Sequence, residues 1–160
     1  MDPRAVLRWI LDGDFDKYFP CRQVYGICFN YNNEILVIKG PDTNNWLIPG
    51  GTPEEGEGYE ETLIRELLEE ADVKIKNLIP LGVQEVNFPD NPNRVDGDLF
   101  YQMRMVCEVD KLLPQTVDPA QGFVFERKFV PMEEITDWVR WGKLGGVMFA
   151  DAIKVWKQNR

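Results

Sequence analysis

The hydrophobic positions at the amino terminus recur at the spacing of one helical face. They are Val6, Leu7, Ile10 and Leu11. Asp2-Pro3, just before them, is a typical helix start, because aspartate can cap a helix and proline fits its first position. The pattern predicts that residues 1–18 form an N-terminal helical extension.

Two runs that are rich in β-branched and aromatic residues follow, at 22–31 and 34–39. The intervening Asn32-Asn33 favours a tight turn, so these runs are predicted to be the two strands of a hairpin. Further strands are expected near residues 79–87, 99–109 and 123–130, and loops rich in Pro, Gly, Asn and Asp separate them.

Helical periodicity is clearest over residues 58–71, and shorter helical patterns start at Pro131 and at residue 146. The residues of the last helix, 146–157, that are expected to face inward are Val147, Phe149, Ala150, Ile153 and Trp156. Strands around a central helix, with helices at both ends, predict an α/β fold in which a mixed β-sheet packs between helical layers. The length of 160 residues suits one domain, 1–160.

The charge of the chain is concentrated in one segment. The whole sequence has 27 acidic and 18 basic residues and a net charge of −9, and residues 54–72 contain eight glutamates and one aspartate against a single arginine. The rest of the chain is therefore close to neutral. This balance argues against an extended nucleic-acid partner, but it is compatible with a nucleotide whose charge is met by metal ions.

Several kinds of catalytic site are excluded by composition. The chain contains no histidine, so it has no Ser-His-Asp triad and lacks the usual ligand of catalytic zinc. Cys21, Cys28 and Cys107 are scattered, which fits a reducing compartment better than a disulfide framework. The amino-terminal apolar run is too short and too charged for a signal peptide or a membrane span. We therefore expect a cytoplasmic protein without a membrane partner.

Three glutamates of the predicted central helix share one face. Glu66, Glu69 and Glu70 are spaced i, i+3, i+4, so their carboxylates lie together and repel one another. Either solvent or a bound divalent cation can offset this repulsion, and oxygen ligands alone favour Mg²⁺ or Mn²⁺. Gly50-Gly51 could bring a backbone carbonyl close to such an ion, and the spacing of Glu57 and Arg65 allows an ion pair.

Residues 51–73 resemble the Nudix box, GX5EX7REUXEEXGU, in which U is aliphatic. Every fixed position matches except the last glycine, where Asp72 stands, and Trp46 to Gly50 is similar to the usual lead-in. The resemblance implies a Nudix-type α/β/α sandwich with the box as a loop and helix over residues 50–73. Asp72 is expected to adopt the left-handed cap conformation that glycine would supply, with a small effect on stability and with activity retained.

The resemblance also implies an activity: Mg²⁺-dependent hydrolysis of the pyrophosphate linkage in a nucleoside diphosphate joined to another group. Glu66, Glu69 and Glu70 would be metal ligands together with the Gly50 carbonyl, and Glu57, Arg65 and Gly51 would support them. Glu66 and Glu69 are the catalytic residues expected within the box. A carboxylate must serve as the base, and the candidates outside the box are Glu126, then Asp118 and Glu85.

The substrate is much less predictable from the sequence. Candidate contacts to the base or the phosphates are Arg22, Trp46, Phe88 and Tyr101. Pro89 lies 16 residues beyond the box, a spacing similar to one found in ADP-ribose pyrophosphatases; another nucleotide sugar and an (oxidised) nucleoside triphosphate are the alternatives. The rival functions are a non-catalytic Nudix-fold nucleotide-binding or regulatory protein and an acidic interaction helix without metal. A homodimer is compatible with each of them.

Overall fold

The computed structural model describes residues 4–89 and 98–160. Its centre is a mixed β-sheet whose strands are ordered β1-β5-β6-β2-β3-β7, and the short strand β4 pairs separately with β2. The strands are β1 (Val6–Ile10), β2 (Cys21–Phe29), β3 (Glu34–Lys39), β4 (Gly50–Gly51), β5 (Val73–Asn87), β6 (Leu99–Leu112) and β7 (Glu126–Pro131). The central pair β2·β6 is parallel, whereas the other pairs are antiparallel.

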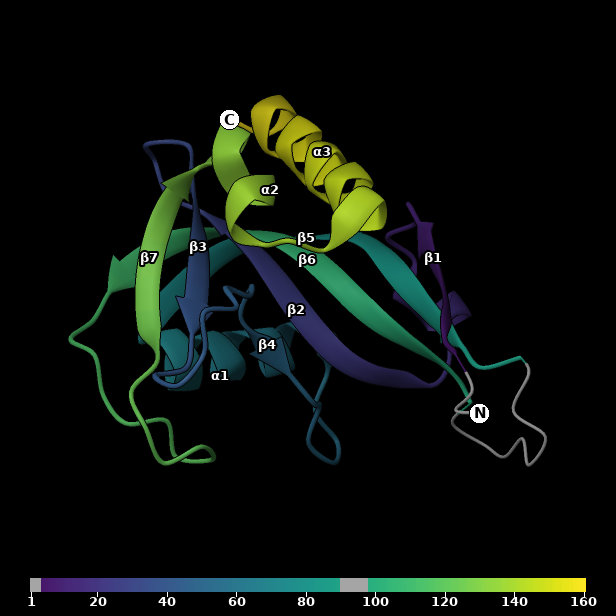
Figure 1. Cartoon of the computed structure of the whole chain (residues 1–160), viewed down its shortest axis with the longest axis horizontal. Coiled ribbons are helices and arrows are strands. Elements are labelled where there is room, and N and C mark those ends of the chain that lie inside the picture. The colour runs from purple at the N-terminus through teal and green to yellow at the C-terminus, as the bar shows by residue number, and fades with distance from the viewer. Residues whose placement is uncertain (1–3, 90–97) are drawn as a thin grey trace.

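Helices cover both faces of the sheet (Figure 1). They are the α-helices α1 (Tyr59–Ala71), α2 (Ile135–Trp138) and α3 (Gly142–Gln158), with 3₁₀ turns η1 (Phe15–Lys17) and η2 (Met132–Glu134). Leu63 and Leu67 of α1 are buried against one face, and Phe149 and Trp156 of α3 are buried against the other. The predicted α/β sandwich with a mixed sheet is therefore confirmed.

The predicted hairpin is also confirmed, since β2 and β3 are antiparallel neighbours and Asn33 has a positive φ of 61°. Several boundaries differ from the prediction. Strand β5 begins at Val73, directly after α1, and accommodates this length through bulges opposite β6. No helix among the described residues is both long and apolar enough to cross a membrane.

The prediction of an N-terminal helix over residues 1–18 is wrong where the structure describes this segment. Residues 6–10 form β1, which pairs with β5 from Val6↔Asn87 to Ile10↔Val83. The stripe that suggested a helix is not a buried face, because Val6, Leu7 and Leu11 are 55%, 47% and 59% exposed. Pairing of the backbone with β5 satisfies its hydrogen bonds, whereas so short a helix would lack a packed face to stabilise it.

The carboxy-terminal helix was predicted with the correct type, and three of the five residues expected to face inward, Phe149, Ile153 and Trp156, pack in or against the core. Helix α3 starts at Gly142 and continues through Gly145 and Gly146. The prediction is wrong for Val147 and Ala150, which are exposed, and it missed Met148 and Ala152, which are buried. Gly145 lies close to Trp141, where an added Cβ would be 2.6 Å from the Trp141 Cβ.

Candidate active site

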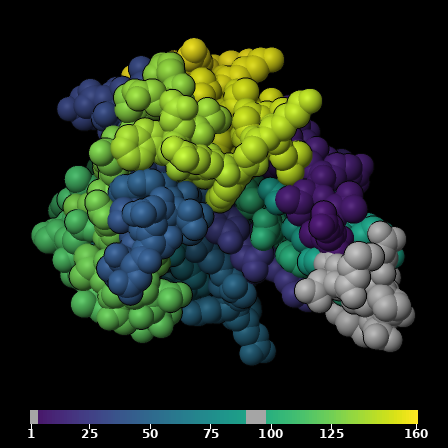
Figure 2. Space-filling model, in the orientation of Figure 1, coloured from purple at the N-terminus to yellow at the C-terminus, as the bar shows by residue number. Residues whose placement is uncertain are grey.

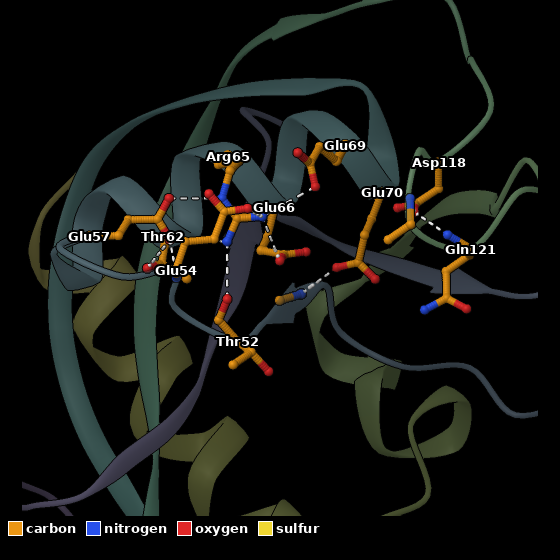
Figure 3. Close-up of polar contacts among 12 residues, drawn as sticks. Thr52, Glu54, Glu57, Thr62, Arg65, Glu66, Glu69, Glu70, Asp118 and Gln121 are labelled. Carbon is orange, nitrogen blue, oxygen red and sulfur yellow. Dashed lines mark hydrogen bonds and ion pairs between the residues drawn. The ribbon is translucent and has the colours of Figure 1, made fainter.

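Helix α1 presents its glutamates at the edge of β4. Leu63 and Leu67 are fully buried against the sheet, so the face one step around the helix, which bears Glu66, Glu69 and Glu70, lies beside Gly50 and Gly51. Figure 3 shows these carboxylates in a row along the helix. The helix begins after Gly58, whose N–H donates to the Glu61 carboxylate at 3.4 Å.

The two glycines of β4 are required by close approach. A Cβ on Gly50 would lie 2.2 Å from the Val24 carbonyl oxygen of β2, and a Cβ on Gly51 would lie 2.4 Å from the carboxyl carbon of Glu66. Both distances are far shorter than a van der Waals contact, so no larger residue fits without displacement. The backbone is thereby placed directly against the acidic face, as the sequence suggested.

Arg65 and Glu57 form the expected ion pair. Arg65 Nε donates to Glu57 Oε2 at 2.8 Å, and Nη2 donates to Oε1 at 3.0 Å. Thr62 Oγ1 and the Glu54 N–H also donate to Oε1, at 2.7 and 3.1 Å. The Arg65 guanidinium, followed by these two donors, lowers the pKa of Glu57 to about 2.

Arg65 also holds two of the clustered glutamates (Figure 3). Its Nη1 donates to Glu66 Oε1 at 2.9 Å and to Glu69 Oε2 at 3.2 Å, while Nη2 reaches the Thr52 carbonyl at 3.1 Å. One guanidinium therefore orients carboxylates from the helix and from the loop before it. It also supplies the positive charge that their mutual repulsion requires.

Glu70 has a different partner from Glu66 and Glu69. It accepts a hydrogen bond from the Gly50 N–H at 2.9 Å and lies near Asp118 in Figure 3. Burial raises the pKa of Glu70 to about 8, and the charges of Glu66, Asp118 and Glu69 add to this effect. Burial also raises the pKa of Glu66, although Arg65 opposes the change.

The donor set is suited to a hard divalent cation. It consists of carboxylates and a neighbouring backbone, and it includes the half-buried Glu70, which has no cationic partner among the described residues. Oxygen ligands of this kind favour Mg²⁺ or Mn²⁺. Within residues 4–89 and 98–160, the acidic side chains do not already converge as a ligand group. Glu66 and Glu69 instead point to Arg65, and Glu70 points to the Gly50 amide.

Asp72, the departure from the box pattern, ends the helix in the left-handed conformation that was predicted, with φ 54° and ψ 42°. Its carboxylate is buried and accepts hydrogen bonds from the Thr116 N–H at 2.8 Å and from Thr116 Oγ1 at 2.6 Å. Arg127 Nη1 donates to the Ala71 carbonyl at 2.8 Å. These contacts offset the unfavourable negative charge at a helix carboxy terminus. They could not be predicted from local sequence, because the partners are more than 40 residues away.

The loop that follows Thr116 places Asp118 beside the acidic face. Asp118 is 2% exposed, and its Oδ1 accepts hydrogen bonds from the N–H groups of Ala120 and Gln121, both at 2.8 Å. Its charge raises the pKa values of Glu70 and Glu66, behind the effect of burial. Aspartate followed by Pro119 is a typical start of such a side-chain-stabilised turn, and this signal would have ranked Asp118 higher.

The other two candidate bases have different partners. The Glu126 carboxylate is 58% exposed on β7 and pairs with Lys39 at 2.9 Å. Glu85 on β5 pairs with Arg8 at 3.0 Å and accepts a hydrogen bond from Tyr101 Oη at 3.1 Å. Within the described part of the chain, neither residue contacts a box glutamate.

The four predicted substrate contacts do not form one cluster. Arg22 stacks on Phe100, with 4.7 Å between the guanidinium carbon and the ring centre, and Phe88 donates its N–H to the Asp98 carbonyl at 2.8 Å. Tyr101 bonds to Glu85 as described above. Trp46 instead lines a cavity of about 840 Å³ beside α2, where it packs edge-to-face on Trp138.

Comparison with known proteins identifies the domain that contains this site. The model of the NUDIX domain matches residues 20–145. A Bacillus subtilis (strain 168) protein named "Putative 8-oxo-dGTP diphosphatase" is 34% identical over 74 residues, which are 46% of this chain and 50% of the relative. "Nudix hydrolase 5" of Arabidopsis thaliana is 27% identical over 128 residues, 75% of this chain and 39% of the relative. The matched part of the chain thus spans half or less of the length of these two relatives.

Solved structures share the fold at low sequence identity. A Bacillus subtilis pyrophosphohydrolase has a TM-score of 0.69 and 18% identity, and the match covers 93% of this chain and 90% of that one. A Nudix hydrolase from Listeria monocytogenes has a TM-score of 0.62 and 19% identity, with 86% and 95% covered. At these identities the likeness establishes the architecture of the sheet and helices.

Proposed function

We propose that this chain, which belongs to the Nudix family, is a pyrophosphohydrolase that uses water to cleave the phosphoanhydride of a small nucleotide derivative. The observation that carries the proposal is the row of Glu66, Glu69 and Glu70 beside the β4 backbone, in which Arg65 orients Glu66 and Glu69 and the Gly50 N–H orients Glu70. None of the box glutamates is missing, which argues against the non-catalytic alternative.

The residues that would hold a divalent cation are Glu66, Glu69, Glu70 and the Gly50 carbonyl. When bound, Mg²⁺ or Mn²⁺ would neutralise the phosphate oxygens and lower the pKa of the attacking water. Binding a cation requires Glu66 and Glu69 to exchange their contacts with Arg65 Nη1. Arg65 would stay in place meanwhile, because its Nε and Nη2 remain bonded to Glu57.

Asp118 is the stronger candidate for the base that takes a proton from water. It lies beside the acidic face on a loop fixed by its own hydrogen bonds, whereas Glu126, the first choice from the sequence, is paired with Lys39. The substrate class within the family, whether ADP-ribose, another nucleotide sugar or an (oxidised) nucleoside triphosphate, is decided by assay. The similarity to a relative named for 8-oxo-dGTP makes that nucleotide a necessary member of the panel.

The decisive experiment measures phosphate release from a nucleotide panel in the presence of Mg²⁺, after coupling to a phosphatase. Glu69→Gln should reduce the rate by orders of magnitude without unfolding the protein, and Glu60→Gln, at an exposed position of the same helix, is the matched control. Full activity of Glu69→Gln would refute the assignment. Tight nucleotide binding without turnover of any compound would favour a regulatory Nudix protein.

A second pair of variants tests the base. Asp118→Asn preserves the Oδ1 acceptor for the two backbone amides, so the loop should persist while kcat falls by about 10²- to 10⁴-fold. Glu126→Gln should leave kcat within about twofold. The reverse result would reassign the base to Glu126.

A further inference from the structure

A buried arginine that has no carboxylate partner among the described residues lies on the opposite face of the sheet from α1. Arg104 of β6 is 2% exposed, and its guanidinium lies 4.6 Å from the centre of the Tyr25 ring and 5.5 Å from that of Trp141. Its Nη2 donates to amide oxygens of Gln84 at 3.3 Å and Gln102 at 3.2 Å, and Nη1 has no hydrogen-bond partner among the described residues.

Arg104 Nε donates to Met148 Sδ at 3.3 Å, so Nη1 is the nitrogen left without a partner among the described residues, and this is energetically unfavourable for a buried cation. Burial of a charge requires a counter-ion or a full set of hydrogen bonds. Both bonds of Arg104 to neutral amides are longer than the usual 2.9–3.0 Å. Burial lowers the pKa of Arg104 to about 10, so the group is still a cation at neutral pH.

Arg104 lines a cavity of about 510 Å³ under the first turn of α3. In the space-filling view, a recess separates this turn (yellow-green) from β1 (purple), with strands of the sheet at its floor (Figure 2). Arg140 also lines the cavity, and its described lining contains no acidic residue. Both charged side chains in the described lining are therefore basic, in a chain whose net charge is −9.

The amino terminus of α3 adds a second, independent attraction for an anion. Gly142 and Gly145 line the same cavity. The cap residue Trp141 makes no side-chain capping hydrogen bond, and the first turn has no acidic residue. Because Gly142 and Gly145 belong to the first turn, the positive end of the dipole of this 17-residue helix lies at the space beside Arg104.

The cavity adjoins the acidic site through one residue. Tyr25, which stacks on Arg104, pairs in the sheet with Gly50, and the Gly50 N–H donates to Glu70. Tyr25 is therefore the residue that lies between the box and Arg104.

We propose that the cavity lined by Arg104 and the first turn of α3 is an oxyanion-binding subsite, which takes a phosphate or carboxylate group of the substrate separate from the bond that is cleaved. An entering oxyanion would replace the two long amide contacts of Nη2, and rotation of those glutamine side chains would give it access to Nη1. That the bound group belongs to the substrate rests on the proposed function, whereas the binding of an oxyanion in this cavity does not.

The first test uses inorganic phosphate without divalent metal. Amide resonances of Gly142 and Gly145 in ¹H–¹⁵N spectra should shift saturably, and acetate in a parallel titration distinguishes a carboxylate site from a phosphate site. Arg104→Met should weaken binding at least about tenfold, because a charge-assisted hydrogen bond is lost. Arg160→Met is the matched control, because Arg160 stacks on Trp156, 5.2 Å from the ring centre, and does not line the cavity.

A second variant tests the proposal even if Arg104→Met does not fold. Leu144→Glu places a carboxylate on the cavity wall, where it should pair with Arg104, raise the melting temperature and compete with phosphate. The proposal is overturned if wild-type protein shows no saturable shift with either anion, if folded Arg104→Met binds as wild type, or if Leu144→Glu leaves phosphate affinity unchanged.

The selectivity of the subsite is tested with substrate pairs that differ by one phosphate, NADPH against NADH and coenzyme A against its dephospho form. The phosphorylated member of a cleaved pair should have the higher kcat/KM, and Arg104→Met should abolish this difference while sparing the other member. An unchanged preference in the variant would overturn the subsite as a determinant of specificity. Saturable phosphate binding without any hydrolysis would instead sustain the anion site and refute the proposed function.

Discussion

Replacement of Asp72 by glycine would restore the usual box residue, yet we expect Asp72→Gly to destabilise the protein. The aspartate carboxylate accepts two hydrogen bonds, from the N–H and the Oγ1 of Thr116, at 2.8 and 2.6 Å. Glycine removes both acceptors. It leaves a partly buried N–H group without its partner.

The two opposing effects can be compared. Loss of the two hydrogen bonds from Thr116 should lower the free energy of unfolding by about 3 kcal/mol. Each hydrogen bond to a charged acceptor contributes about 1.5–3 kcal/mol, and water replaces part of the bond that is exposed to solvent. Glycine regains about 1 kcal/mol, since it adopts the left-handed conformation at φ 54° without strain. The net loss is about 2 kcal/mol, or a fall in melting temperature of about 4–8 °C for a chain of this length.

The assay is thermal unfolding of wild type, Asp72→Gly, Thr116→Val and the double variant, each paired with kcat on the best substrate. The two changes should be strongly non-additive, because both remove the same contact. Activity should fall with stability, since Thr116 precedes the loop that bears Asp118. Equal or higher stability of Asp72→Gly, or additive effects in the cycle, would refute the reasoning.

Three further outcomes are expected. Glu57→Gln should destabilise the protein at pH 6–7, and the difference in stability from wild type should shrink as pH falls from about 4.5 toward 2. A carboxylate whose pKa is depressed to about 2 stabilises the fold above its ordinary pKa of 4.5 and loses that effect as it is protonated in the folded state. A stability difference that stays constant across this pH range would contradict the prediction. Saturating Mg²⁺ should raise the melting temperature, by the equivalent of about 2.7 kcal/mol at a hundredfold excess over Kd, and Glu69→Gln should lose most of this gain; no shift in wild type would count against the metal face. Gly51→Ala should lower kcat at least about tenfold, because its Cβ would lie 2.4 Å from the Glu66 carboxyl carbon. Gly146→Ala is the control that should retain activity, because no atom lies within 4 Å of the added Cβ.

The parts of the fold that could be predicted depend on local pattern. The α1 helix and the left-handed end at Asp72 follow from periodicity and backbone preference within one segment, and the ion pair of Glu57 and Arg65 was anticipated from a spacing of eight residues. The amino-terminal strand could not be predicted in this way. Its spacing fits a helical face as well as a strand, and the partner that decides between them, β5, begins more than 60 residues later.

The limits of prediction at the site have the same origin. Asp118 reaches the acidic face only because the chain returns to Asp72 after β6, so composition alone ranked Glu126 above it. The anion site at Arg104 likewise could not be predicted from the sequence, where Arg104 is one basic residue in a predicted strand. Its burial and the absence of a carboxylate near it in the described residues arise from the pairing of three strands under α3.

The amino-terminal strand has a consequence for solubility. Without β1, the fifteen-residue strand β5 would end the sheet with a row of unpaired amide and carbonyl groups along residues 83–87. Such an edge is a template for strands of other molecules and promotes aggregation. The five residues of β1 replace it with a shorter edge, on which Arg8 is exposed and charged. Strand β1 therefore contributes few buried side chains, but it protects the edge of β5 from pairing with strands of other molecules.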